Sequence, residues 1–582
     1  MRTLLRLMRY QAVYKRLVFF SIVSLVAYLA LEGAAPAAIS VAINEGLAKD
    51  DGGGALAVFA LLAAGLFLAR GLLSAIFNFL WQYQSRLIER NLRDDFYAHL
   101  QRLSYSFYDR ADSGDLISRG ISDIEAARMA SGMGLFRMGE ILGKYAVVLV
   151  IMFSTSTRLA LWTLASMPLM IATTIYFSRE LRRRWVRVQA QRSIMTSTLT
   201  EALTGARVVK AFAQEEAETD RFERTVRDLT QYFLDTIKQY SFFLPILVFL
   251  SSLGTIALIW VGFSMVIDQE IAVGTVVQFN IYVAMLFGPT RGLGAVVQRL
   301  QNGIAAAERV FETLDLRPDV EGPAEPAPRE PMSGHIRFEG VDFGYGHGEM
   351  VLHDIEVDIK PGSTVGIIGP TGAGKTTLVG LIGRHYDPRA GRVTIDGRDV
   401  REYDLEWLRR NLATVPQDPY LFTNMMDKNI AYARPESGRA EIEAAAAQAQ
   451  AGRFIDALPE GYDTIVGERG VGLSGGQRQR VTISRALLMD APILIMDDST
   501  SNVDTGTERL IRDAMKESFE GRTTIVVGQR VGSVMDADEI LVMDEGRVVE
   551  RGVHEDLVAA GRLYAEILRL QSPATEGVEA GE

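Results

Sequence analysis

The sequence predicts a multidomain membrane protein, in which a domain of six transmembrane helices precedes a soluble α/β domain. Three observations carry this prediction. Six long apolar stretches fall within the first 300 residues, a glycine-rich turn follows a short apolar run at residues 365–368, and a proline-rich stretch separates the two parts. A chain of 582 residues is also too long for a single core, so several domains are expected.

Each of the six apolar stretches is long enough to cross a bilayer, which needs about 20 apolar residues. They lie near residues 17–43, 55–81, 137–157, 159–178, 241–267 and 272–296. Ala35-Pro36-Ala37 could be read as a signal-peptidase site, but the apolar stretch continues past it and five more follow. Residues 1–315 are therefore expected to form a transmembrane domain.

The positions of Lys and Arg predict the orientation of the spans. Basic residues gather at the N-terminus and in Arg179–Arg192, whereas the loops at 44–54, 154–158 and 267–271 hold only Lys49 and Arg158. This bias predicts cytoplasmic N- and C-termini in the cytoplasmic (inner) membrane. The polar stretches after the second and fourth spans are rich in helix formers, so they are expected to extend the membrane helices into the cytoplasm.

Four ionisable residues fall inside the predicted spans, where a charge is costly and needs a partner or a cavity. Glu140 and Lys144 are four residues apart, so they are expected to pair on one helix, although a role in substrate binding is the alternative. Glu32 and Arg70 are expected to pair across two helices.

Residues 316–333 contain five prolines, which predict an extended linker rather than a packed helix. A soluble domain is expected over 334–571, with its first strands at 336–338 and 341–345, followed by a disordered acidic tail at 572–582. The formal net charge of −11 argues against a nucleic-acid partner. The absence of cysteine removes disulfides, thiolate zinc sites and thiol nucleophiles.

The glycine-rich turn fits the pattern G-x-x-x-x-G-K-[ST] and leads into a helix-forming run at 376–382. Glycine lets the backbone curl so that its N–H groups face a polyphosphate at the helix N-terminus. Lys375 can then reach the outer phosphates and the Thr376 hydroxyl can bind Mg²⁺. The alternative is a tight turn that binds nothing. The candidate binding residues are Gly369, Pro370, Thr371, Gly372, Ala373, Gly374, Lys375, Thr376 and Thr377.

Two further stretches complete the phosphate chemistry. The apolar run 493–496 ends in Asp497, as a buried parallel strand that supplies a second Mg²⁺ contact would, and the amide of Gln417 can touch both metal and attacking water. A second glycine-rich phosphate grip is expected at Leu473, Ser474, Gly475, Gly476 and Gln477, opening a helix at 478–488. The alternative, a helix capped by Ser474, requires the same geometry.

These motifs, in this order and spacing, resemble an ATP-binding cassette (ABC) ATPase. Together with the six spans, residues 1 to about 572 resemble a half-transporter of the type IV, multidrug-exporter-like ABC exporters. The resemblance implies an α/β P-loop nucleotide-binding domain that uses ATP and Mg²⁺, with Tyr345 stacked on adenine and Asp504 in the D-loop. It also implies head-to-tail pairing of two cassettes, with ATP between each P-loop and the other LSGGQ. Residues 109–123 and 210–221 correspond to the coupling helices.

Two catalytic positions depart from the family pattern. Asp498 stands where the family has the glutamate base, and its carboxylate is withdrawn by roughly 1 Å, a misplacement that costs about 10²-fold in rate. Gln529 replaces the switch histidine and brings no cationic form. Either change alone can be a tolerated variant. Together they predict the degenerate-site subunit of a heterodimeric exporter, with a second half-transporter as partner and a drug, lipid or peptide as cargo.

Two other readings remain open at this point. One is a homodimeric exporter in which Asp498 suffices as the base, and the other is a slow ATP-gated channel or regulator.

Overall fold

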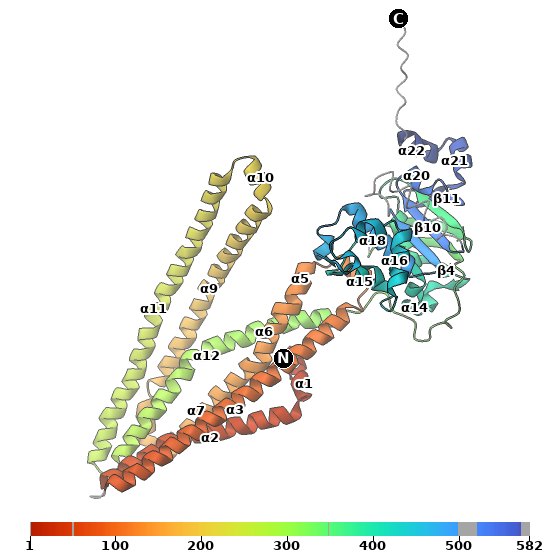
Figure 1. Cartoon of the computed structure of the whole chain (residues 1–582). Coiled ribbons are helices and arrows are strands. Elements are labelled where there is room, and N and C mark those ends of the chain that lie inside the picture. Colours follow the sequence, from red (N-terminus) through yellow and green to blue (C-terminus); the bar gives the residue numbers. More distant parts are fainter. Residues whose placement is uncertain (1, 49–51, 347, 499–520, 572–582) are drawn as a thin grey trace. The chain divides into compact units, whose positions relative to one another are not determined.

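The computed structural model describes residues 2–48, 52–346, 348–498 and 521–571. The chain divides into two compact units (Figure 1). The first comprises residues 1–101 and 112–316, and the second comprises residues 102–111 and 317–582. The short segment 102–111 therefore belongs to the second unit, although the helices on both sides of it belong to the first.

The first unit is all helical. Its described helices are α1 (Arg2–Ala12), α2 (Lys15–Ala48), α3 (Gly52–Leu100), α5 (Ser113–Ser118), α6 (Ile124–Met129), α7 (Leu135–Thr155), α8 (Thr157–Leu164), α9 (Met167–Thr204), α10 (Ala206–Ala211), α11 (Glu215–Ile267) and α12 (Val273–Leu314). Two π-helical turns, at Arg119–Asp123 and Ala130–Gly134, lie on either side of α6. A core cluster around Tyr282 and Phe279 of α12 packs against α7, α8 and α11.

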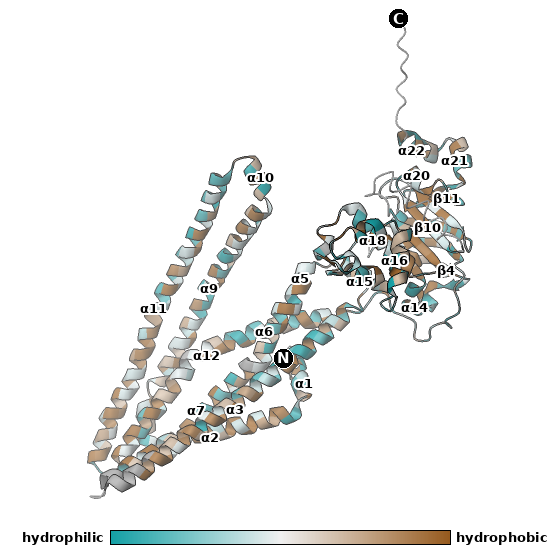
Figure 2. Ribbon diagram, in the orientation of Figure 1, coloured by the Kyte–Doolittle hydropathy of each residue, from teal (hydrophilic) through white to brown (hydrophobic). Residues whose placement is uncertain are grey.

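Five helical segments in the described part of the chain are long and apolar enough to cross a membrane. They are Lys15–Glu45, Leu61–Leu100, Thr157–Thr204, Glu215–Ile267 and Val273–Leu314. The remaining predicted span, near 137–157, corresponds to α7, which is not among them, so the count of six stays a prediction. Figure 2 shows that polar residues of α9 and α11 gather near α10, while apolar residues gather toward the opposite ends.

The long helices continue beyond their apolar parts, as expected, but their connections begin earlier than predicted. α3 ends at Leu100 and α5 starts at Ser113, inside the predicted turn 109–123. Asp112 caps α5 by accepting a 2.8 Å hydrogen bond from the Gly114 amide, which starts the helix there. α9 ends at Thr204 and α11 starts at Glu215, inside the predicted turn 210–221, since acidic residues in a first turn favour a helix N-terminus.

Two ion pairs were predicted in the membrane domain, and the structure confirms one of them. Arg70 on α3 lies 3.0 Å from Glu32 on α2, so that predicted pair is confirmed. The predicted Glu140–Lys144 pair is wrong. Lys144 reaches across to Glu32 at 2.9 Å, and Glu140 pairs with Arg137 one turn earlier at 2.6 Å. The Glu32 side chain is only 4 % exposed, and a carboxylate buried to this extent needs a cationic partner.

The described part of the second unit contains three sheets. Its described strands are β1 (Ile336–Phe343), β2 (Leu352–Ile359), β3 (Thr364–Ile368), β4 (Ala390–Ile395), β5 (Arg398–Asp399), β6 (Leu412–Val415), β7 (Asn424–Met425), β8 (Ile465–Val466), β9 (Ile493–Asp497), β10 (Thr523–Gly528), β11 (Glu539–Asp544) and β12 (Arg547–Gly552). The six-stranded sheet has the order β12-β11-β3-β10-β9-β6, and the four-stranded sheet has the order β2-β1-β4-β5. The two strands predicted at 336–338 and 341–345 are one strand, β1, whose register shifts between Phe338 and Val341.

Helices surround these sheets and complete two cores. They are α4 (Tyr105–Tyr108), α13 (Lys375–Ile382), α14 (Leu405–Arg410), α15 (Met426–Ile430), α16 (Arg439–Gln448), α17 (Gly452–Asp456), α18 (Gly475–Leu488), α20 (Val531–Val534), α21 (His554–Ala560) and α22 (Leu563–Gln571). One core joins both large sheets with α13, and the other joins α15, α16 and α18 to β6 and β9. In the larger sheet, β11, β3, β10, β9 and β6 run parallel, so their carboxyl ends meet at one edge.

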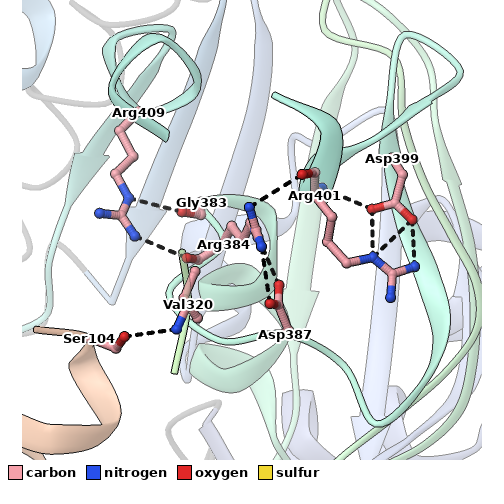
Figure 3. Close-up of polar contacts among 8 residues, drawn as sticks. All are labelled: Ser104, Val320, Gly383, Arg384, Asp387, Asp399, Arg401 and Arg409. Carbon is pink, nitrogen blue, oxygen red and sulfur yellow. Dashed lines mark hydrogen bonds and ion pairs between the residues drawn. The ribbon is translucent and has the colours of Figure 1, made fainter. Parts of the chain in front are cut away.

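Hydrogen bonds fasten the segment 102–111 and the linker to this unit. Figure 3 shows the Ser104 hydroxyl, which accepts a 2.9 Å hydrogen bond from the Val320 amide. Nearby, Arg409 donates to the carbonyl oxygens of Gly383 at 3.2 Å and Arg384 at 3.0 Å, and so holds the turn that follows α13 (Figure 3).

Candidate nucleotide-binding site

The glycine-rich turn connects β3, at the centre of the parallel sheet, to α13. Gly372 and Gly374 have φ values of 86° and 91°, a left-handed conformation that residues with a Cβ rarely adopt. At Gly374 a Cβ would also lie 2.8 Å from the Leu352 side chain. The turn therefore needs glycine at both positions, and it ends where the free N–H groups of α13 begin, an arrangement that suits an anion.

The Lys375 side chain folds back over the turn that precedes it. Its ammonium nitrogen lies 2.8 Å from the Gly369 carbonyl oxygen and 2.9 Å from that of Pro370. Burial lowers the pKa of Lys375, while the carboxylates of Asp498 and Asp497 act in the opposite direction. Among the described residues, the hydrogen bonds of this buried ammonium go to two carbonyl oxygens, and such a group fits a neighbouring phosphate.

Asp497 ends β9 and lies beside the start of α13. The Thr376 hydroxyl donates a 3.2 Å hydrogen bond to the Asp497 carboxylate, so oxygen atoms from two distant parts of the sequence meet. Burial raises the pKa of Asp497, and the neighbouring Asp498 raises it further, whereas Thr376 and Lys375 lower it. A hydroxyl and a carboxylate are hard oxygen donors, and one cation between them would relieve the crowding of two carboxylates. These residues therefore fit Mg²⁺.

Asp498 and two glutamines, Gln417 and Gln529, lie near these residues. The Asp498 amide donates a 2.9 Å hydrogen bond to the Val527 carbonyl, and its φ of 43° turns the chain sharply after β9. The Gln417 side-chain amide donates a 3.3 Å hydrogen bond to the Asp498 carboxylate. Gln529 follows β10, and its backbone carbonyl accepts a 2.6 Å hydrogen bond from Gln571.

Together these groups line a cavity of about 260 Å³. Its described lining residues are Val351, Thr371, Gly372, Gly374, Lys375, Thr376, Thr377, Gln417, Asp497, Asp498, Val527 and Gln529. The fold thus brings together residues that the sequence places more than a hundred positions apart. Val351 and Val527 are apolar additions that motif reasoning missed, and their only sequence signal is that they adjoin or belong to strands beside the glycine-rich turn.

The LSGGQ stretch forms a regular helix start. The Ser474 hydroxyl accepts a 3.3 Å hydrogen bond from the Gln477 amide, and the Gln477 side chain accepts a 2.8 Å hydrogen bond from the Ser474 amide. This reciprocal pair is a capping box at the start of α18. None of residues 473–477 is among the described residues that line the cavity. The two glycine-rich elements of the chain are therefore not brought into one site.

Tyr345 lies beside the glycine-rich turn. Its hydroxyl shares a 2.9 Å hydrogen bond with the Thr377 hydroxyl, and its ring packs edge-on against Tyr386 at 5.2 Å. The side chain remains 43 % exposed, which leaves aromatic surface available for a planar ligand. Asp504, the predicted D-loop residue, lies outside the described residues.

Sequence reasoning missed the contact between the segment 102–111 and the cassette. Tyr105 stacks on His385 with a ring separation of 4.1 Å, and the Tyr386 hydroxyl donates a 2.8 Å hydrogen bond to Asp109. Burial lowers the pKa of His385 to about 4, and Arg409 adds to this shift. The signal in the sequence is His385-Tyr386 directly after α13, but it does not name a partner. Tyr386 also contacts Tyr345, so this contact adjoins the nucleotide cavity.

A helical membrane domain joined to a P-loop domain of this architecture defines a membrane-bound nucleoside triphosphatase. The comparisons with known proteins agree. Residues 18–290 match the ABC transporter transmembrane region, and residues 352–501 match the ABC transporter domain. The chain belongs to the ABC transporter family, and it is an ABC-type ATPase and translocase.

Relatives of similar length support this assignment. An uncharacterized ABC transporter ATP-binding protein of Bacillus subtilis, YknV, is 35% identical over 481 residues, which cover 83% of this chain and 80% of that protein. The ATP-dependent lipid A-core flippase of Desulfotalea psychrophila is 34% identical over 516 residues, which cover 89% and 90%. A solved bacterial Atm1-family ABC exporter with ATP bound matches with a TM-score of 0.82 and 30% identity, covering 97% of this chain and all of that chain.

Proposed function

We propose that this chain is one half of a heterodimeric exporter that moves a hydrophobic or amphipathic substrate across the cytoplasmic membrane. Its own site holds Mg-ATP but hydrolyses it poorly, while its LSGGQ completes the active site of the partner. The observation that carries this proposal is one cavity in which binding groups are intact and hydrolytic groups are altered. Lys375, Thr376 and Asp497 line it together with Asp498 and Gln529.

The binding residues have separate tasks. Lys375 exchanges its carbonyl partners for the outer phosphates, and the N–H groups at the start of α13 hold the same anion. Thr376 and Asp497 hold Mg²⁺, which neutralises phosphate charge when it is bound. Tyr345 stacks on the base. These roles follow from where the residues lie in the cavity and from their chemistry, and none of these residues departs from the family pattern.

The hydrolytic residues are where this site is weak. Gln417 and Asp498 are hydrogen-bonded, so both face the place of the attacking water. Asp498 has one methylene less than glutamate, which leaves its carboxylate about 1 Å short of a base's position. Gln529 donates a neutral hydrogen bond where a cation would stabilise developing charge. The chain thus keeps its nucleotide and turns it over slowly.

The LSGGQ element supplies the other half of the proposal. Its capping box is regular, and it lies outside the cavity of its own chain. A second cassette arranged head to tail would present its P-loop to Ser474 and the N-terminus of α18. That partner is expected to carry the catalytic glutamate and the switch histidine, with an altered LSGGQ. In this arrangement the site at the partner's P-loop hydrolyses ATP, and the site at this chain's P-loop keeps ATP bound and holds the dimer together.

Export of an amphipathic molecule is favoured by the relatives. The matched flippase acts, by its name, on lipid A-core, and the matched structure is an exporter. The basic ends of the apolar helices support cytoplasmic termini and a location in the inner membrane. A cargo that enters from the cytoplasmic side is consistent with this orientation.

One purification separates this proposal from its alternatives. The chain is expressed alone, and its oligomeric state and ATP hydrolysis are measured in nanodiscs. Slow hydrolysis is expected, and it should rise when the partner is added. A homodimer with strong ATPase activity would instead support the homodimeric exporter, and ATP-dependent ion current without transport would support the gated channel.

A further inference from the structure

The loop that carries Gln529 is held by the distant helix α22. Gln571 is the last residue of α22 and lies 42 positions after Gln529. Its side-chain nitrogen donates a 2.6 Å hydrogen bond to the Gln529 carbonyl oxygen, and its side-chain oxygen accepts a 2.8 Å hydrogen bond from the Val531 amide. One side chain therefore bridges the backbone of two residues in the loop that follows β10.

The two hydrogen bonds fix the orientation of this bridge. A backbone carbonyl can only accept and a backbone N–H can only donate, so the side-chain nitrogen of Gln571 must face Gln529 and its oxygen must face Val531. Val531 is 2 % exposed and is the first residue of α20. The N–H groups in the first turn of a helix have no partner within that helix, and burial makes an unpaired N–H costly. Gln571 supplies the partner of the Val531 amide.

α22 is well enough anchored to support this loop. Tyr564 of α22 is fully buried in a core cluster that also contains Val531 of α20 (Figure 1). The Tyr564 hydroxyl shares a 2.7 Å hydrogen bond with His554 at the start of α21, and the Tyr564 amide donates a 3.3 Å hydrogen bond to the Glu550 carboxylate. α20 and α22 therefore share one core, which keeps the end of α22 beside the loop.

The other end of the loop is held by β10. Gly528 pairs with Ile368 of the neighbouring strand β3, and a Cβ at Gly528 would collide with the Ser533 hydroxyl. Gln529 follows directly and lines the nucleotide cavity. Within the described part of the chain, its side-chain amide makes no hydrogen bond, whereas its carbonyl is held by Gln571. The backbone of this residue is thus fixed while its side chain stays available to a ligand in the cavity.

Exact placement matters more for a glutamine at this position than for a cation. The attraction between a cation and a phosphate falls slowly with distance, whereas a neutral N–H donor loses its hydrogen bond steeply as the distance or angle departs from the ideal. A misplacement of about 1 Å can cost about 10²-fold in rate. A residue that fixes the backbone of Gln529 therefore decides how well its side chain reaches an outer phosphate.

We propose that Gln571 is a positioning residue of the nucleotide site, which acts through Gln529 and directs the side-chain amide of Gln529 toward the terminal phosphate of ATP. Gln571 itself is not among the described residues that line the cavity. Its contribution should appear with ATP and be absent with ADP, which has no terminal phosphate of this kind. The effect on ATP rests on the role proposed above for Gln529, whereas the bridge to the loop does not.

Hydrogen exchange tests the bridge in the nucleotide-free chain. The full chain in nanodiscs is placed in deuterated buffer, and the peptide that contains Val531 is followed by mass spectrometry. Gln571→Ala removes both hydrogen bonds and should speed exchange of the Val531 amide by about 3-fold or more. Gln571→Glu keeps an acceptor for Val531 but loses the donor to Gln529, so exchange should stay slow. Leu570→Ala truncates the neighbouring side chain, which is 80 % exposed, and should leave exchange unchanged.

Nucleotide affinity tests the positioning. Mg-ADP and Mg-AMP-PNP, a non-hydrolysed analogue that has a terminal phosphate, are titrated into the same proteins by calorimetry. Gln571→Ala and Gln571→Glu should each weaken AMP-PNP binding by about 3- to 10-fold, while ADP binding should change by less than about two-fold. Gln529→Ala should give the same pattern. Because Gln571 acts through Gln529, the double change should weaken AMP-PNP binding no further than Gln529→Ala alone.

Three results would overturn the proposal. The first is unchanged exchange of the Val531 amide in Gln571→Ala. The second is equal weakening of ADP and AMP-PNP binding, which would indicate a structural role alone. The third is an additive effect of the two changes in the double variant. A chain that binds neither nucleotide would instead contradict the proposed function, and the exchange measurement would still decide whether the bridge exists.

Discussion

The proposal that this nucleotide site hydrolyses ATP poorly makes a quantitative prediction about Asp498. Its main chain is anchored by the 2.9 Å hydrogen bond to Val527 and turns sharply at a φ of 43°. The backbone cannot advance toward the water without breaking this contact, so only a longer side chain can extend the carboxylate. Replacing Asp498 by Glu adds one methylene, which recovers roughly the 1 Å whose loss costs about 10²-fold in rate.

The expected results follow from this geometry. Asp498→Asn should leave the slow hydrolysis by the purified chain within a few-fold, because a displaced base contributes little. The double change Asp498→Glu and Gln529→His should raise hydrolysis by about 10²-fold or more, in the range of a positioned general base. Each single change should give much less than the double, since the base and the charge stabiliser act as a unit.

Phosphate release in nanodiscs at saturating Mg-ATP is measured for the unmutated chain and for the four variants. Lys375→Ala provides the background, because it removes nucleotide binding and reports any contaminating ATPase. A loss of most of the Lys375-dependent activity in Asp498→Asn would refute the reasoning. Asp498 would then be a working base, and the chain would be an ordinary, homodimeric ATPase.

Four further predictions follow. In the heterodimer, Lys375→Ala should reduce bound nucleotide from two to one per complex in equilibrium binding, and unchanged stoichiometry would contradict its assignment. Gly476→Trp should stop turnover of the complex by blocking approach to the partner's nucleotide, without changing nucleotide binding at this chain's own P-loop; normal phosphate release would contradict head-to-tail pairing. Glu32→Gln should destabilise the membrane domain more than Glu180→Gln does, because it removes a 4 % exposed carboxylate that pairs with both Lys144 and Arg70, whereas the more exposed Glu180 should contribute less than about 1 kcal/mol; equal thermal shifts would count against this difference. His385 is neutral when folded, with a pKa of about 4 against 6.5 when unfolded, so the unfolded chain binds the extra proton. Its contribution should therefore be complete above about pH 6.5 and lost as the pH falls toward 4, and His385→Gln should flatten the thermal stability profile in that window; an unchanged profile would disprove it.

Local motifs were predicted well because the chemistry they carry depends on adjacent residues. The glycine-rich turn needs left-handed backbone at Gly372 and Gly374, and the capping box needs Ser474 and Gln477 three positions apart. Such requirements are visible in the sequence. The contact between Thr376 and Asp497 was predictable for a related reason. A buried strand that ends in Asp belongs in the same parallel sheet as the strand before the glycine-rich turn.

Long-range pairing was harder to predict. The i, i+4 spacing of Glu140 and Lys144 suggested a local pair, but Lys144 pairs with Glu32 of another helix and Glu140 pairs with Arg137. A rule based on spacing within one helix does not consider partners on other helices. The basic residues around Arg179 predicted the orientation of the spans, but the sequence did not predict that Glu180 pairs with Arg183 and Arg184.

The attachment of the segment 102–111 also bears on how such transporters can be recombined. The cassette carries part of its own surface on a piece of chain encoded within the gene region for the membrane half. A chimera cut at the proline-rich linker would place Tyr105 and Asp109 against a foreign cassette that lacks matching partners for them. The two halves are therefore expected to diverge together, and a workable exchange of cassettes must transplant both pieces of chain.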